Sequence, residues 1–162
     1  MFRSLVIAFT LALGLSQAAI AQEFKVDFGI ASGDPDAPVE VSADALSIDQ
    51  ETGGAKFDGN VIITQGEMRM EADLVDVFYT EDQSGISRLV GSGGVSIFSG
   101  KDTAKAQTAE YDVTSGLIHM NGNVVLVQGA NSISSERMTV NTKNSTAELH
   151  GRVRTVLRPK AN

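Results

Sequence analysis

A glycine followed two residues later by valine recurs along the chain, each time within a stretch of alternating apolar and polar residues. The four pairs are Gly59/Val61, Gly93/Val95, Gly122/Val124 and Gly151/Val153. Glycine weakens the interior of a strand, and where it occurs there it usually marks a sharp bend or a bulge. The recurrence therefore predicts strands that bend at the same place in every repeat, so that the stacked strands form two facing sheets.

A short alanine-acid or similar step precedes each of these glycines at a nearly constant distance. The steps are Ala43-Asp44, Ala72-Asp73, Ala106-Gln107 and Ser135-Glu136. Three of the four steps have the same spacing to their glycine, and the spacing from Asp73 to Gly93 is longer by one short insertion. This regularity indicates four repeats of about 29 residues, the last of which ends near Pro159.

Within the repeats apolar residues alternate with polar ones, which is typical of a strand with one buried face. Residues 118–126 show the pattern clearly, and no amphipathic helical stretch appears after Gln22. Turn-forming residues separate the strands, as at Thr52-Gly53-Gly54 and Thr114-Ser115-Gly116. The sequence therefore predicts an all-β fold, an open β-jellyroll or V-shaped sandwich of two sheets around an apolar interior groove.

The N-terminal segment 1–21 has the parts of a secretory signal peptide. Arg3 supplies a positive charge, Leu5–Leu15 form a largely apolar run, and Ala19-Ile20-Ala21 is a cleavage site with small residues. The run is too short to cross a bilayer as a helix, which needs about 20 apolar residues. We therefore expect a signal peptide over 1–21 and a periplasmic mature chain. Its expected parts are a flexible lead-in over 22–38, one β domain over 39–159 and a tail over 160–162.

Charge and composition argue against several classes of protein. Without Arg3 the chain has 12 basic and 20 acidic residues, a net charge near −8, which argues against nucleic-acid binding. The chain has no cysteine, so its stability must come from a hydrophobic core and backbone ladders. His119 and His150 are the only histidines and lack metal-ligand spacing, and no Gly-x-Ser-x-Gly motif occurs. We expect no metal, no cofactor and no enzymatic activity.

The element Gly-Asn-Val-x-φ-x-Gln-Gly, in which φ is an apolar residue, occurs at 59–66 and again at 122–129. Together with residues 38–44, 57–58, 120–121 and 152–157, it resembles the OstA-like β-jellyroll family of periplasmic lipopolysaccharide-transport proteins. The resemblance extends from about Pro38 to Pro159. In that family the acyl chains lie inside the jelly roll and the sugars stay outside.

The resemblance implies a lipopolysaccharide-binding transport protein that bridges the inner and outer membranes during outer-membrane assembly. Its implied partners are the lipid A moiety of lipopolysaccharide, an inner-membrane transport complex and an outer-membrane translocon, the latter two through like-folded domains. The alternatives are a periplasmic β-solenoid scaffold and a different OstA-like member of the same machinery.

The resemblance also implies which residues line the groove. By match to the family these are Val39, Val41, Ile97, Tyr111 and Val113, although Val113 has the opposite strand parity from Tyr111. The alternation adds five residues of inward parity: Val61, Ile63, Val95, Val124 and Leu126.

The first and last strands of such a stack leave backbone groups unpaired, and these are templates for another strand. Val39–Ala43 supply the leading edge, near the acids of 34–40, and the trailing edge carries the arginines of 152–158. Opposite charges at the two ends predict head-to-tail self-association by strand addition. The assembly-edge residues are Val153, Thr155 and Leu157.

The cleavage site predicts that the exported protein begins at Gln22. The measurement is the intact mass of the protein recovered from periplasmic extract, with N-terminal sequencing as a second check. Recovery of a chain that retains residues 1–21 would contradict the prediction.

Overall fold

The described part of the chain is built from antiparallel strands, and it contains no helix. In this computed structural model the described residues are 24–27, 37–49, 51 and 53–158. The expected signal peptide, the mature start at Gln22 and the tail over 160–162 lie outside them. Within the described residues no helix is long and apolar enough to span a membrane. The strands are β1 (Phe24–Asp27), β2 (Glu40–Ser42), β3 (Ala45–Ile48), β4 (Ala55–Gln65), β5 (Met68–Tyr79), β6 (Ile86–Ser99), β7 (Asp102–Ala106), β8 (Thr108–Asp112), β9 (Leu117–Gln128), β10 (Asn131–Asn141), β11 (Thr146–His150) and β12 (Arg154–Val156).

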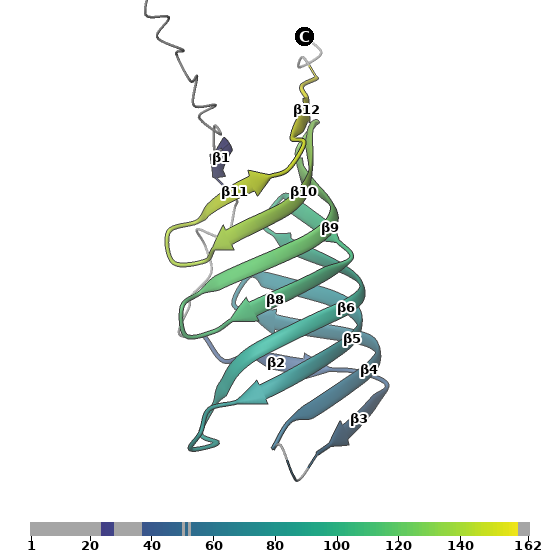
Figure 1. Cartoon of the computed structure of the whole chain (residues 1–162), viewed down its shortest axis with the longest axis vertical. Helices are drawn as coiled ribbons and strands as arrows, with labels where there is room; N and C mark the ends of the chain where they lie inside the picture. Colours follow the sequence, from purple (N-terminus) through teal and green to yellow (C-terminus); the bar gives the residue numbers. More distant parts are fainter. Residues whose placement is uncertain (1–23, 28–36, 50, 52, 159–162) are drawn as a thin grey trace, which may run out of the picture.

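Long bent strands give the sheet two arms, and the stack rises from β3 to β12 (Figure 1). β4, β5, β6, β9 and β10 cross both arms, and each short strand except β1 pairs with one half of a long strand. β1 pairs with the short strand β11. Arm A contains β2, β7 and β12 beside the halves 61–65, 68–72, 95–99, 124–128 and 131–135. Arm B contains β3, β8, β11 and β1 beside the other halves. The predicted all-β V-shaped architecture is confirmed, as one continuous folded sheet.

The bends lie at the recurring glycines. Each glycine and the residue after it have positive φ: 79° and 47° at Gly59-Asn60, 81° and 97° at Gly93-Gly94, 84° and 49° at Gly122-Asn123, and 78° and 41° at Gly151-Arg152. Glycine adopts this left-handed conformation at no steric cost, and asparagine tolerates it better than most residues. The ladder between β4 and β5 shifts register at this point, between Asp58 and Val61. The glycine pattern therefore predicts the corners correctly.

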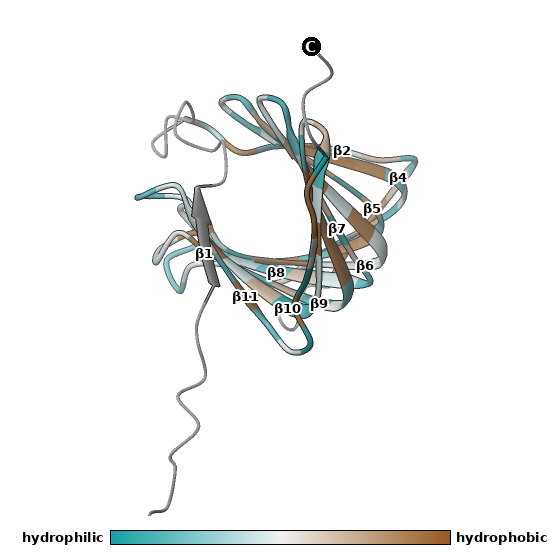
Figure 2. Ribbon diagram, turned by 90° about the horizontal axis from the view of Figure 1, so that it is seen from above, coloured by the Kyte–Doolittle hydropathy of each residue, from teal (hydrophilic) through white to brown (hydrophobic). Residues whose placement is uncertain are grey.

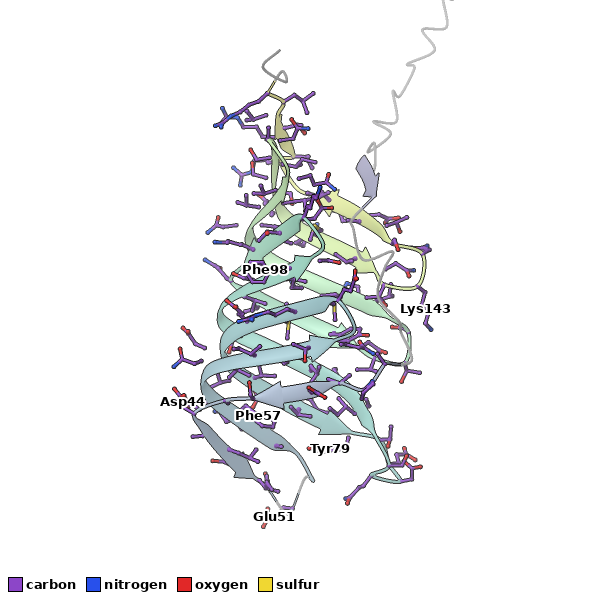
Figure 3. The ribbon with its side chains drawn as sticks, turned by 180° about the vertical axis from the view of Figure 1, so that it is seen from behind. Asp44, Glu51, Phe57, Tyr79, Phe98 and Lys143 are labelled. Atoms are coloured by element: carbon purple, nitrogen blue, oxygen red, sulfur yellow. The ribbon has the colours of Figure 1, made fainter. Side chains whose placement is uncertain are left out.

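The alanine-acid step lies directly across from the glycine on the neighbouring strand. The Asp44 amide donates to the Gly59 carbonyl at 2.9 Å, and the Asn60 side-chain amide donates to the Asp44 carboxylate at 2.7 Å. Gln107 and Glu136 donate in the same way to Gly122 and Gly151, at 3.0 Å each. Figure 3 shows Asp44 at the bend where β2 passes into β3. The two recurring sequence features are thus the two sides of one corner.

The lead-in contains a strand that the sequence pattern does not predict. β1 pairs antiparallel with β11, from Phe24 opposite Leu149 to Asp27 opposite Thr146. β2, the next strand in the chain, lies at the other end of the stack and pairs with β4. The chain's own N-terminal segment therefore occupies the outer edge of β11 in arm B (Figure 1).

Replacement of Gly93 by alanine should destabilise the fold by about 2–4 kcal/mol. A Cβ at this position would lie 2.6 Å from the Asp73 Cβ, and the backbone would keep a φ of 81°. Left-handed strain contributes about 1–2 kcal/mol and overpacking about 1–3 kcal/mol. The measurement is the free energy of unfolding in urea.

Gly85→Ala is the matched control, because a Cβ at Gly85 meets no heavy atom within 4 Å. It should change the free energy of unfolding by less than about 0.5 kcal/mol. Equal destabilisation by the two substitutions would contradict the account of the corner.

Candidate functional site

Inward-facing side chains from both arms form one apolar core along the length of the stack. In arm A one cross-strand row comprises Ile63, Met70, Ile97, Ala104, Leu126 and Ile133. In arm B one row comprises Ala55, Val77, Leu89, Tyr111, Ile118, Val140 and Ala147. Every residue in both rows is at most 6% exposed. Viewed along the stack, the strands trace the two arms on either side of this interior (Figure 2).

The candidate groove residues all belong to this interior or border it. Seven of them are buried: Val61, Ile63, Val95, Ile97, Tyr111, Val124 and Leu126. Val39, Val41 and Val113 are partly buried and pack against the same core. Val113 reaches it despite its parity because β8 ends at Asp112. Its amide donates to the Ser87 carbonyl at 3.0 Å in the turn that follows, where strand alternation no longer applies.

The interior also contains a polar contact that joins the arms. The Tyr111 hydroxyl in arm B donates to the Gln65 side-chain carbonyl in arm A at 2.8 Å. The side-chain amide of Gln65 donates to the carbonyl of Ala37 at 3.2 Å. Burial raises the pKa of the Tyr111 phenol above its ordinary value of 10.0, so the hydroxyl remains a donor at neutral pH. This pair lies at the mouth, the side of the V where the turns of arm A face those of arm B.

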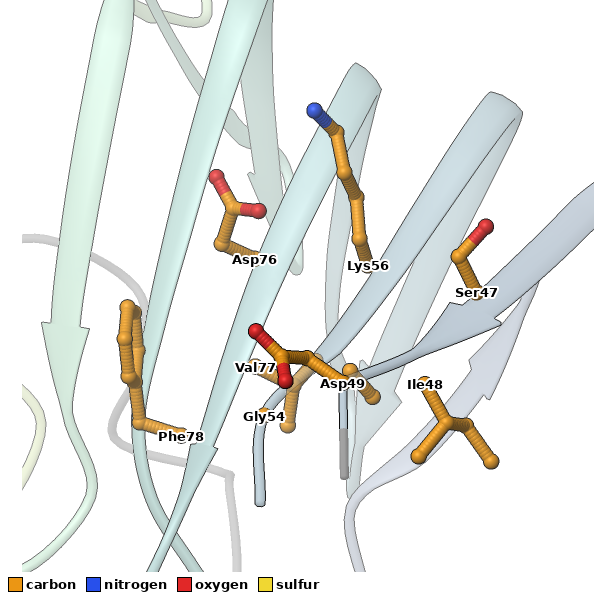
Figure 4. Close-up of a pocket in the computed structure, with 9 residues that line it drawn as sticks. Ser47, Ile48, Asp49, Gly54, Lys56, Asp76, Val77 and Phe78 are labelled. Carbon is orange, nitrogen blue, oxygen red and sulfur yellow. The ribbon is translucent and has the colours of Figure 1, made fainter. Parts of the chain in front are cut away.

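At the N-terminal end of the stack the inner face is uncovered. Leu46 and Ile48 on β3 have the same parity as the core, yet they are 53% and 68% exposed. A shallow hollow lies beside Ile48, between Asp49, Lys56 and Phe78 (Figure 4). β3 is an edge strand that pairs only with β4 among the described strands. Strand edges of this kind, with unpaired backbone groups and exposed apolar side chains, are general templates for pairing with another strand.

At the C-terminal end, the predicted assembly-edge residues are exposed. Thr155 lies in β12 opposite Ile133 of β10, while Val153 and Leu157 flank the strand and are 39% and 72% exposed. Arg152 already forms an ion pair within the chain, because its Nε donates to the Glu136 carboxylate at 2.8 Å, while its side chain remains 91% exposed. The contact lies at the corner, where the Arg152 backbone has the left-handed φ of 41°.

Sequence reasoning misses two parts of this arrangement. It treats Gln65 only as part of the repeated Gln-Gly element, yet the inward parity of this residue relative to Ile63 is readable in the sequence. The alternation of Leu46 and Ile48 with polar neighbours is also readable in the sequence, but it does not show that no described strand covers them. Among the described residues no three His, Cys, Asp or Glu side chains are grouped to hold a metal ion.

The profile of one known family matches residues 40–146 and is described as LptA/(LptD N-terminal domain) LPS transport protein. Among curated proteins, the lipopolysaccharide export system protein LptA of Escherichia coli K12 is 29% identical over 138 residues. That match covers 79% of this chain and 75% of the relative. The lipopolysaccharide export system protein LptH of Pseudomonas aeruginosa is 26% identical over 118 residues, covering 68% of this chain and 66% of the relative.

A solved structure has the same fold. The crystal structure of Pseudomonas aeruginosa LptH, described as the LptA homologous periplasmic component of a lipopolysaccharide transport device, superposes with a TM-score of 0.69 at 19% identity. The superposition covers 78% of this chain and 99% of that one. At this identity the superposition supports the fold, and the family rests on the sequence match.

Proposed function

This chain belongs to the family of LptA and the LptD N-terminal domain, and we propose that it is a periplasmic lipopolysaccharide carrier that shields acyl chains between its two arms. Lipopolysaccharide transport is the function that the family and the curated relatives have in common. The finer proposal is that the interior between the arms is the lipid site. No chemical step is needed, because the role is binding and transfer.

The apolar interior carries this proposal. Its walls run from β4 at one end of the stack to β11 at the other, and both arms contribute to them. Each methylene group moved from water into such an environment gains about 0.8 kcal/mol, so one acyl chain of about 12 methylenes gains about 10 kcal/mol. A trough of this kind lowers the barrier to moving a lipid through water without any catalysis.

Inward-facing side chains of the two arms fill the interior, so the arms must part for acyl chains to enter. Ile97, Leu89 and Met120 are 0% exposed, and their contacts are with side chains of the protein. On loading, these contacts are exchanged for contacts with acyl chains of similar polarity. The exchange keeps most of the apolar area buried. Separation of the two arms therefore costs far less free energy than exposure of both apolar walls to water would.

The ends of the stack support the second element of the proposal, head-to-tail assembly with like-folded domains. Along arm A the order runs through β2, β4, β5, β6, β7, β9, β10 and β12, and strands spaced about 4.8 Å apart give a stack of roughly 34 Å. Such a stack is short for a bridge between two membranes. Free edges at β2 and β3, with the exposed Leu46 and Ile48, suit docking onto the β12 end of another domain. The domain at either end is another copy, the inner-membrane complex or the outer-membrane translocon.

The groove proposal predicts where a photo-crosslinker captures lipopolysaccharide. Ile97 and Ser96 are adjacent on β6 and have opposite parity, Ile97 facing the interior and Ser96 the outside. A photoreactive phenylalanine at Ile97 should capture lipopolysaccharide in cells, and the same group at Ser96 should not. Equal capture at the two positions, or none at Ile97 in a folded protein, would contradict the groove.

A charge in the wall should prevent loading. Val41→Asp places a carboxylate at a half-buried position of the wall, where burial of an unpaired charge costs several kcal/mol. Asp58→Ala, on the outward parity of β4, is the control. Native mass spectrometry should find a lipid adduct on the wild type and on Asp58→Ala but not on Val41→Asp. A wild type isolated gently without any adduct would favour the scaffold alternative.

The assembly proposal predicts that removal of residues 153–162, which include β12, weakens self-association while the β fold remains. Removal of residues 159–162 alone is the control, because it leaves β12 and its pairing with β10 in place. Sedimentation velocity over a range of concentrations measures the oligomers. The same distribution for both truncations would refute pairing through this edge.

A further inference from the structure

A hydrogen bond joins the tips of the two arms across the mouth. Gln65 is the last residue of β4 and begins a turn of arm A, whereas Tyr111 lies near the end of β8 in arm B. The Tyr111 hydroxyl and the Gln65 carbonyl oxygen are 2.8 Å apart, and the two residues are 3% and 6% exposed. The contact therefore lies at the place where separation of the arms begins.

Each partner is also fixed to its own arm. Tyr111 makes a second side-chain hydrogen bond with Thr142, which follows β10 in arm B. The Thr142 hydroxyl is the donor in that contact, and the Thr142 backbone amide donates to the Gly116 carbonyl at 2.8 Å. On the other side, Gln65 donates to the Ala37 carbonyl, in the segment that leads into β2. A bond whose two ends are held independently resists movement of one arm relative to the other.

We propose that the Tyr111–Gln65 hydrogen bond is a latch that holds the unloaded protein closed and sets how readily acylated lipid enters. The inference rests on the proposed function, because the latch is useful only if the interior receives acyl chains. Breaking the bond while the pair stays buried loses one buried hydrogen bond with no water to replace it, whereas water reaches both groups once the arms have parted. The latch therefore selectively stabilises the closed state.

Tyr111→Phe removes the hydroxyl and retains the ring in the wall. If the closed state predominates, the apparent affinity for lipopolysaccharide is proportional to the small fraction of open protein. Loss of one buried neutral hydrogen bond should raise that fraction, and with it the apparent affinity, about five-fold. The rise should appear in the association rate constant, because opening precedes entry. The measurement is stopped-flow fluorescence and equilibrium titration with fluorescently labelled lipopolysaccharide and the full mature chain.

Asp112→Ala is the matched control for general loosening. Asp112 is the next residue on β8, has outward parity, and accepts a hydrogen bond from the Ser115 amide at 2.8 Å. Its loss weakens the β8–β9 turn without touching the contact across the mouth. Urea unfolding of both variants shows whether their losses of stability are comparable. Asp112→Ala should leave the association rate within about two-fold of the wild type.

A double mutant tests whether the two residues act as one unit. Gln65→Met should also accelerate association, and the Tyr111→Phe/Gln65→Met double mutant should be no faster than the faster single variant, since only one bond of this pair spans the mouth. Additive increases would overturn the latch, as would a Tyr111→Phe rate no higher than that of Asp112→Ala. A wild type that binds no lipopolysaccharide would instead refute the proposed function.

Discussion

The long strands must change direction at their midpoints without losing their place in the ladder, and the two-residue left-handed corner makes this possible. At each corner the side chain of Asp44, Asp73, Gln107 or Glu136 lies over a glycine, where a Cβ would come within 2.7 Å of a side-chain atom or closer. Because the corner recurs at the same level in successive strands, the corners align and the sheet folds along one line. Both arms and the apolar interior between them follow from that alignment.

Much of this architecture is predictable from sequence, because its causes are local. Strand alternation places Ile97 and Leu126 inside, and a glycine such as Gly122 within an alternating run specifies a bend. The longer spacing between Asp73 and Gly93 also has a local cause, since the β5–β6 hairpin is extended and turns at Thr80–Gly85. These features depend on neighbouring residues and on strand geometry alone.

Other features depend on contacts between distant segments, which the pattern does not contain. The pairing of β1 with β11 joins opposite ends of the described chain. Residues 24–27 alternate apolar and polar as a strand does, but this local pattern does not indicate the strand with which they pair. The contact between Gln65 and Tyr111 spans 46 positions and exists only because the arms close on each other. The salt bridge that occupies Arg152 likewise depends on the corner that brings Glu136 beside it.

The interior and the ends of the stack have different tasks in this account. In the proposed function, the apolar side chains of the closely packed interior exchange their contacts with one another for contacts with acyl chains, and the exposed edge at Leu46 and Ile48 docks onto the next domain. The task of the interior depends on the claim that the arms part, because acyl chains reach the interior only when arm A separates from arm B.

Spin labels at Glu67 and Thr114, both exposed at the tips of arms A and B, test that claim by pulsed electron paramagnetic resonance. The chain has no native cysteine, so the two labels are introduced without background. The account predicts a longer distance between the labels when lipopolysaccharide is bound than in the unloaded protein. An unchanged distance distribution in a protein with bound lipopolysaccharide would contradict it.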